Sequence, residues 1–162
     1  MIRVFRISTS TALLLLTALL FQAGIPFGVA QTHKARAGSG DDAPLFQEYR
    51  SIQIGMTTDE VRKKLNDPTD KSDEQDFFVF SDNESAQVFY DKSRKVFAIS
   101  VNFLNGARDM PTAKNVFGSD IPVKPDGSMY KMVRYPKAGC WVSFSRTAGN
   151  SPLTTVTLQR IE

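Results

Sequence analysis

The clearest pattern in the chain is the alternation of apolar and polar residues over residues 96–103, which is typical of a β-strand with one buried face. One face would carry Phe97, Ile99, Val101 and Phe103, and the other would carry Ala98, Ser100 and Asn102. Residues 77–80 and 86–90 are also rich in aromatic and β-branched residues, and the turn-forming stretches "SDNES" and "DKSR" separate the three segments. Together the three segments predict an antiparallel meander.

A short helix is predicted immediately before this meander. Thr57 is followed three positions later by Glu60, which is the spacing of a capping box at a helix start. Val61 and Leu65 lie one turn apart on the same side, and Asn66 is a residue that tolerates the left-handed conformation at a helix end. A helix of this length is unstable alone, so we expect its apolar side to pack on the sheet.

The same order of elements is predicted in the second half of the chain. Asp109 is the expected N-cap of a short helix that ends at Gly118 and carries Pro111, Ala113, Val116 and Phe117. After the turn "KPDGS", strands are predicted at residues 129–135, 139–145 and 153–161. Two interpretations remain open: residues 45–105 and 106–162 are tandem helix-βββ units, or the second helix resembles the first by chance. In either case the fold class is α+β, with short helices packed on an antiparallel β-sheet.

The first thirty residues have the order of charged, apolar and small residues that is typical of a secretory signal peptide. Arg3 and Arg6 precede an apolar run at residues 12–21, and small residues fit cleavage after Ala30 or Ala37. The run is about half of the roughly 20 residues that a spanning helix needs, which disfavours an uncleaved anchor. No cysteine lies nearby to accept a lipid. The prediction is a signal peptide at 1–30, a flexible linker at 31–44, and a periplasmic or secreted domain at 45–162 without a stable membrane anchor.

The charge of the expected mature protein disfavours nucleic-acid binding. The full chain has 20 Lys and Arg against 17 Asp and Glu. Four of the basic residues and none of the acidic residues precede Gly38, so the remainder has 16 basic against 17 acidic residues. Binding to nucleic acid would require a basic patch on the folded part. We therefore expect no nucleic-acid partner.

The inventory of reactive side chains disfavours catalysis. Cys140 is the only cysteine and stands in an apolar strand pattern, which favours a buried structural thiol. His33 is the only histidine and falls in the linker, so the domain lacks an imidazole for a nucleophile pair or a metal. The acidic segment "DPTDKSDEQD" at residues 67–76 lacks the ligand spacing and turn glycine of an EF-hand, and we interpret it as a solvated loop. No phosphate-binding loop or nucleophile elbow is present. No catalytic residue, cofactor or metal site is expected.

Residues 52–68 follow the pattern I-x-x-G-M-T-x-x-E-V-x-x-x-L-x-x-P, spelled by Ile52, Gly55, Met56, Thr57, Glu60, Val61, Leu65 and Pro68. This signature resembles the opening segment of the SmpA/OmlA/BamE group of bacterial envelope proteins and of the related β-lactamase-inhibitor-protein-like (BLIP-like) fold. The resemblance extends through the predicted meander to about residue 104. It implies helices packed on an antiparallel sheet, and the inhibitor-type members imply a concave sheet that grips a partner protein. BamE proteins are anchored by a lipidated cysteine that this chain lacks, and Asn66 stands where these families usually have Gly.

Aromatic residues are the remaining signal for function. Strict alternation sends neighbours such as Phe77 and Phe78 to opposite faces of the sheet, so each face receives aromatic side chains. An uncovered second face would be an apolar patch of the kind that marks a protein partner. The alternative is that a loop or residues 45–49 cover it. The predicted partner-binding residues are Phe77, Phe89, Tyr135 and Trp141.

These observations favour an exported, non-enzymatic protein-interaction module of the bacterial cell envelope, which binds an envelope or secreted protein through a sheet face. One alternative is a small secreted hydrolase that uses only carboxylates, which would need two of them at a separation of roughly 5 Å or roughly 6.5–9.5 Å for glycoside chemistry. Another is an inhibitor of a secreted enzyme such as a β-lactamase.

Overall fold

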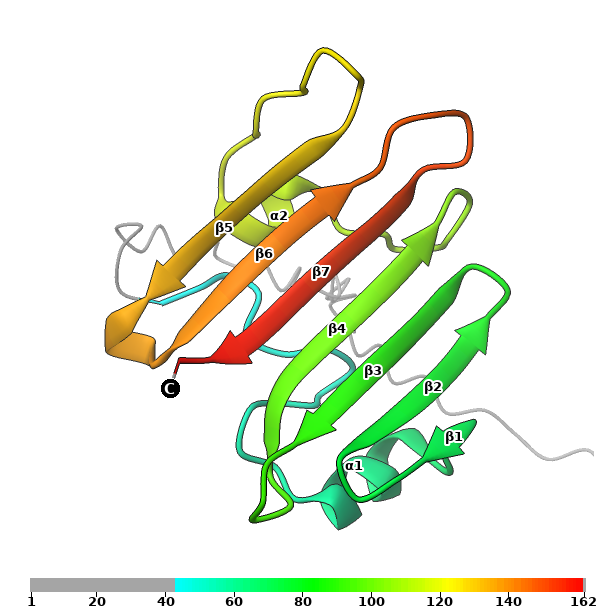
Figure 1. Cartoon of the computed structure of the whole chain (residues 1–162), viewed down its shortest axis with the longest axis vertical. Helices are drawn as coiled ribbons and strands as arrows, with labels where there is room; N and C mark the ends of the chain where they lie inside the picture. The colour runs from blue at the N-terminus through cyan, green and yellow to red at the C-terminus, as the bar shows by residue number, and fades with distance from the viewer. Residues whose placement is uncertain (1–42, 162) are drawn as a thin grey trace, which may run out of the picture. The chain divides into compact units, whose positions relative to one another are not determined.

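The computed structural model describes residues 43–161, and these residues contain seven antiparallel strands in one sheet (Figure 1). The strands are β1 (Asp70–Lys71), β2 (Gln75–Ser81), β3 (Glu84–Tyr90), β4 (Val96–Leu104), β5 (Met129–Tyr135), β6 (Cys140–Arg146) and β7 (Leu153–Arg160). Their order across the sheet is β1-β2-β3-β4-β7-β6-β5. A 3₁₀ turn, η1 (Pro136–Ala138), joins β5 to β6. The predicted signal peptide at 1–30 and residues 31–42 of the predicted linker lie outside the described residues.

Two meanders and the short strand β1 make up the sheet, and the last strands of the two meanders meet in its middle. β2, β3 and β4 form the first meander, and β5, β6 and β7 form the second. β4 pairs with β7, so that Val101 lies opposite Val156. The six long strands lie where the alternation predicts them, within two residues at each end, whereas the two-residue β1 was not predicted. The α+β class with short helices on an antiparallel sheet is confirmed.

Helix α1 (Thr58–Leu65) begins and ends as predicted. The Thr57 hydroxyl accepts a hydrogen bond from the Glu60 backbone N–H at 3.3 Å, and the Glu60 carboxylate accepts one from the Thr57 backbone N–H at 2.8 Å. Asn66 follows the last turn with a φ of 67°. Val61 is completely buried against the sheet, and burial of a valine stabilises a fold by about 1.5–3 kcal/mol.

The residues that precede α1 are held by the start of β4. The Gly55 backbone N–H donates to the Val96 carbonyl at 2.8 Å, and the Val96 N–H donates to the Met56 carbonyl at 2.8 Å. Gly55 has a φ of 89°, a conformation that glycine adopts without strain. The signature segment therefore enters its helix at a fixed point on the sheet.

Helix α2 (Ala113–Phe117) is shorter than predicted, and its predicted cap is wrong. Thr112 is the N-cap, and its hydroxyl accepts from the Asn115 N–H at 3.2 Å while the Asn115 side-chain carbonyl accepts from the Thr112 N–H at 2.9 Å. Asp109 lies three residues before this point with a φ of 55°, which is not a helical conformation. The helix ends at Gly118 in the left-handed conformation, as predicted.

Both helices pack on the same face of the sheet, which we call the helix-covered face (Figure 1). Val61 of α1 belongs to the core cluster over β2, β3 and β4, and Val116 of α2 belongs to the cluster over β5, β6 and β7. Phe46 packs against both clusters, and Tyr49 is buried in the first. Residues 45–49 thus cover this face, and the alternative that they cover the opposite face is wrong.

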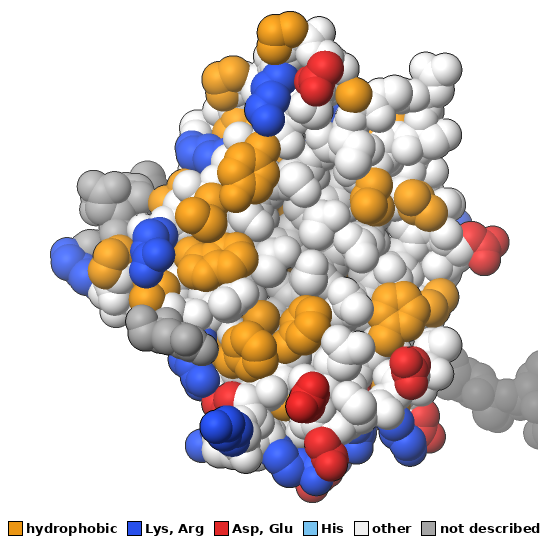
Figure 2. Space-filling view, viewed as in Figure 1, with side chains coloured by type: hydrophobic (Ala, Val, Ile, Leu, Met, Phe, Trp, Pro, Cys, Tyr) orange, Lys and Arg blue, Asp and Glu red, His pale blue; other side chains and the backbone are white. Residues whose placement is uncertain are grey.

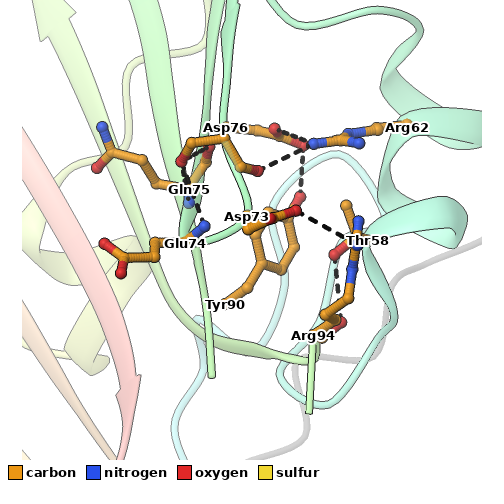
Figure 3. A network of polar contacts seen from close by, with 9 residues as sticks. Thr58, Arg62, Asp73, Glu74, Gln75, Asp76, Tyr90 and Arg94 are labelled. Carbon is orange, nitrogen blue, oxygen red and sulfur yellow. Dashed lines mark hydrogen bonds and ion pairs between the residues drawn. The ribbon is translucent and has the colours of Figure 1, made fainter. Parts of the chain in front are cut away.

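A buried polar network joins α1 to the sheet (Figure 3). Asp76 on β2 has no solvent exposure, and its two carboxylate oxygens accept hydrogen bonds from Arg62 of α1 at 2.9 and 2.7 Å. The Tyr90 hydroxyl donates to the same carboxylate at 2.7 Å. Burial and this bond raise the pKa of Tyr90, which therefore stays a neutral donor. The interpretation of residues 67–76 as a solvated loop is wrong for Asp76, because the helix and β3 enclose its carboxylate.

Removal of the Asp76 carboxylate is expected to destabilise the domain strongly. In an Asp76→Ala variant the buried Arg62 contact is lost and the Tyr90 hydroxyl loses its acceptor, so we expect a loss of about 3–5 kcal/mol in the free energy of unfolding. Urea denaturation followed by Trp141 fluorescence measures this loss. Asp70→Ala, on the exposed strand β1, is the matched control and should change stability by less than about 0.5 kcal/mol. Equal stabilities of the two variants would contradict the role given to Asp76.

Candidate partner-binding face

The second face of the sheet carries neither helix, and Figure 2 looks directly onto it. We call it the open face. Strand register and alternation assign its side chains, because residues paired across strands point to the same side. From β2 to β5 they include Phe77 and Val79, Gln87 and Phe89, Ser100 and Asn102, Thr155 and Thr157, Trp141 and Ser143, and Tyr130 and Met132.

The centre of the open face is polar, and two pairs of its side chains bond to each other across β4 and β7. The hydroxyls of Ser100 and Thr157 are 3.1 Å apart across β4 and β7. The Thr155 hydroxyl donates to the Asn102 side-chain carbonyl at 2.8 Å. Figure 2 shows this centre as a continuous area of uncharged polar side chains and backbone. A partner that covers these two bonded pairs leaves both hydrogen bonds in place.

The margins of the open face carry exposed apolar side chains. Six large hydrophobic side chains are exposed among residues 43–161, and four of them lie on this face. Val79 is 51% exposed and Leu104 42%, on the first meander, while Tyr130 is 56% exposed and Met132 46%, on β5. Because most of the large exposed apolar side chains of the described residues lie on the open face, this face is the candidate interaction surface.

Three of the four predicted partner-binding residues lie on the open face. Phe77, Phe89 and Trp141 are each half-buried there, and their neighbours Phe78 and Tyr90 point into the core. Tyr135 is 4% exposed and belongs to the core under α2, because the alternation of β5 places it on the helix-covered face. The prediction of Tyr135 as a partner-binding residue is therefore corrected.

Strict alternation predicts the wrong side of the sheet for one aromatic residue, Phe97. The register shifts at the start of β4, where Phe89 lies opposite Ala98 and Tyr90 opposite Val96, so Phe97 is the extra residue of a β-bulge. The rings of Phe89 and Phe97 are 6.2 Å apart at an angle of 50°. Phe97 therefore joins the open face and does not share a side with Ile99 in the core.

The two rings form the floor of an open groove of about 1060 Å³ at one end of the open face. Charged side chains surround it, from the β1–β2 loop, the β3–β4 turn and the end of β7: Asp73, Glu74, Asp91, Lys92, Arg94 and Arg160. Arg94 and Asp73 form an exposed ion pair at 3.3 Å, a kind of contact that stabilises little. The groove thus combines aromatic rings with side chains of both charges that can form contacts with a partner.

The carboxylate of Asp91, which lines this groove, accepts several hydrogen bonds. They come from the Ser93 hydroxyl at 2.6 Å, the Lys95 backbone N–H at 3.1 Å and Arg160 at 2.9 Å. These bonds hold the pKa of Asp91 well below its ordinary value of 3.8. The contact with Arg160 also ties the β3–β4 turn to the last strand.

Other chemistry is sparse in the described part of the chain. Cys140 is buried and unpaired, as predicted for a structural thiol, and burial raises its pKa. No group of three or more metal-ligating side chains occurs within residues 43–161. His33 lies outside the described residues.

The Asp91 contacts give a pH-dependent contribution to stability. Because the folded-state pKa is lowered, the stabilisation is complete above the ordinary pKa of 3.8 and is lost as the pH falls through the folded-state value. The unfolding free energy of the natural chain should exceed that of Asp91→Asn at pH 7, and the difference should shrink below about pH 4. Denaturation at several pH values measures it, with Asp82→Asn in the exposed β2–β3 turn as control. A difference that is constant down to pH 2 would contradict this assignment.

No family model, curated protein or solved structure matches the chain. Within residues 43–161, none of the helices has the length and apolar character needed to cross a bilayer.

Proposed function

We propose that this protein is an exported, non-enzymatic interaction module of the bacterial cell envelope, which binds an envelope or secreted protein through the open face of its sheet. The observation that carries the proposal is the composition of that face. Half-buried aromatic rings and exposed aliphatic side chains surround a polar centre in which two pairs of side chains bond to each other. These side chains belong to neither core cluster, because both clusters lie on the other face of the sheet.

The spacing of the aromatic residues supports a protein partner. Phe77 lies on β2, Phe89 and Phe97 meet on β3 and β4, and Trp141 lies on β6, so anchors extend over most of the width of the sheet. Aromatic side chains dominate the binding energy of protein interfaces when neighbouring contacts exclude water. A surface of several strands suits a macromolecule, whereas small ligands bind in enclosed cavities.

We also propose that the domain has a BamE-like and BLIP-like fold made of two related helix-βββ units. Each meander follows a short helix, and each helix begins with a threonine capping box, at Thr57 and at Thr112. Each helix is also followed by a residue of positive φ, Asn66 at 67° and Gly118 at 74°, although only Gly118 has the left-handed helical conformation. β1 has no counterpart in the second unit, and the second helix is shorter. The export of the mature protein rests on the predicted signal peptide.

Site-specific photo-crosslinking tests the proposed function. Benzoyl-phenylalanine is placed at Phe89 or Trp141 on the open face, or at Lys63 or Lys114, which are exposed on the helices, and cells that express the full chain are irradiated. We expect the same partner to be crosslinked from both open-face positions and from neither helix position. Crosslinks of equal yield from the helix positions, or no crosslink from either open-face position, would overturn the proposal.

A further inference from the structure

β5 leaves one side of the sheet unpaired. It is seven residues long, and within residues 43–161 no strand or bridge pairs with its outer side. Alternate backbone N–H and C=O groups of such a strand point away from the sheet and can bind an additional strand. Figure 1 shows β5 at the margin of the sheet, over its full length.

The opposite edge of the sheet is protected against strand addition, which leaves β5 as the candidate edge for binding another strand. There the sheet ends in β1, which has only two residues, both charged and exposed. Short, charged edge strands are a known protection against pairing with other chains. β5 instead exposes Tyr130 and Met132 on the open face, beside its free edge. A strand added there would cover both side chains.

The charges along β5 point to the chemistry of the added strand. Arg134 is exposed on the open face, and Lys131 lies on the helix-covered face with its Nζ 4.9 Å from the centroid of the Phe117 ring. Among residues 43–161, no carboxylate forms an ion pair with either cation. Figure 2 shows basic side chains along this margin of the molecule. An acidic segment would pair with these cations, whereas a second copy of β5 would bring more cations to the same edge.

We propose that β5 binds an extended segment of a protein partner that carries two acidic residues three positions apart. The spacing follows from Lys131 and Arg134, which are three positions apart on opposite faces, since an added strand runs residue by residue beside β5. The two residues between the acidic ones are apolar, to cover Met132 on one face and Val133 on the other. This inference rests on the proposed function only in taking the partner to be a protein.

A designed peptide tests the edge directly. The probe is fluorescein-labelled acetyl-Thr-Glu-Ile-Val-Glu-Val-Thr-amide, and its control has Lys at both Glu positions. Fluorescence anisotropy with the full chain measures binding up to about 1 mM, the weak limit for a short segment. We expect the acidic peptide to bind and the lysine peptide not to bind. The double variant Lys131→Glu/Arg134→Glu should bind the acidic peptide at least about tenfold more weakly and should now bind the lysine peptide. Circular dichroism melting checks that the double variant folds.

Two N-methylated forms of the acidic peptide separate strand addition from simple charge attraction. Each form carries N-methyl groups on one alternate set of residues, and only one set faces β5 in an added strand. We expect one form to lose binding and the other to keep it. Binding of neither original peptide, equal binding of both, or tolerance of both N-methylated forms would overturn the inference.

The failure of this inference can be distinguished from the failure of the proposed function. Phe77→Ser/Phe89→Ser alters the open face on the first meander, far from β5 in the strand order. This variant should reduce photo-crosslinking to the partner from Trp141 and leave peptide binding unchanged. If the acidic peptide does not bind as expected but the photo-crosslinks form as expected, only the inference about the β5 edge is rejected. If the peptide binds as expected but the photo-crosslinks do not form, only the proposed role of the open face is rejected.

Discussion

The contact between Arg62 and Asp76 sets the position of α1 and the register of β2 together. A carboxylate without solvent exposure is costly unless its partners are complete, and here the guanidinium and the Tyr90 hydroxyl supply them. If β2 slipped by one residue, Asp76 would face the open side and Phe77 would enter the core. The ion pair therefore selects one register, whatever its net contribution to stability, and this register places Phe77 on the open face.

A second group of the same composition lies at the other end of the first meander. Arg50 binds both carboxylate oxygens of Glu84 at 3.0 Å, and the Tyr49 hydroxyl donates to the same carboxylate. Burial and this hydrogen bond raise the pKa of Tyr49, so it remains a donor. Arg50 also lies 4.2 Å from the centroid of the Phe80 ring. Since Glu84 begins β3 and Tyr90 ends it, both ends of that strand are fixed by an arginine, a carboxylate and a tyrosine.

Contacts between residues that are close in the sequence were predictable, and contacts between residues that are far apart in the sequence were not. The Thr57 and Glu60 capping box involves four consecutive residues, so its spacing alone identified the helix. At the second helix, two possible capping residues lie close together, and the box of Thr112 uses Asn115 in place of the usual acidic or glutamine residue, so the sequence pattern wrongly favours Asp109. The partners of Asp76 lie fourteen residues away on either side, and the acidic composition around it indicated a solvated loop. Likewise, alternation separated Phe77 from Phe78, but the bulge at Phe97 depends on the pairing with β3 and leaves no local signal.

The distribution of polar and apolar groups on the open face determines where its specificity arises. Because Ser100 and Thr157, and Asn102 and Thr155, bind each other, part of the hydrogen-bonding capacity of these four side chains is already used within the domain. The margins carry the selective groups: the charged groove over Phe89 and Phe97 at one end, and the cations of β5 at one edge. Arg134 pairs in register with Trp141, so a strand added at β5 would lie beside the aromatic anchors, and edge and face would form one continuous binding surface.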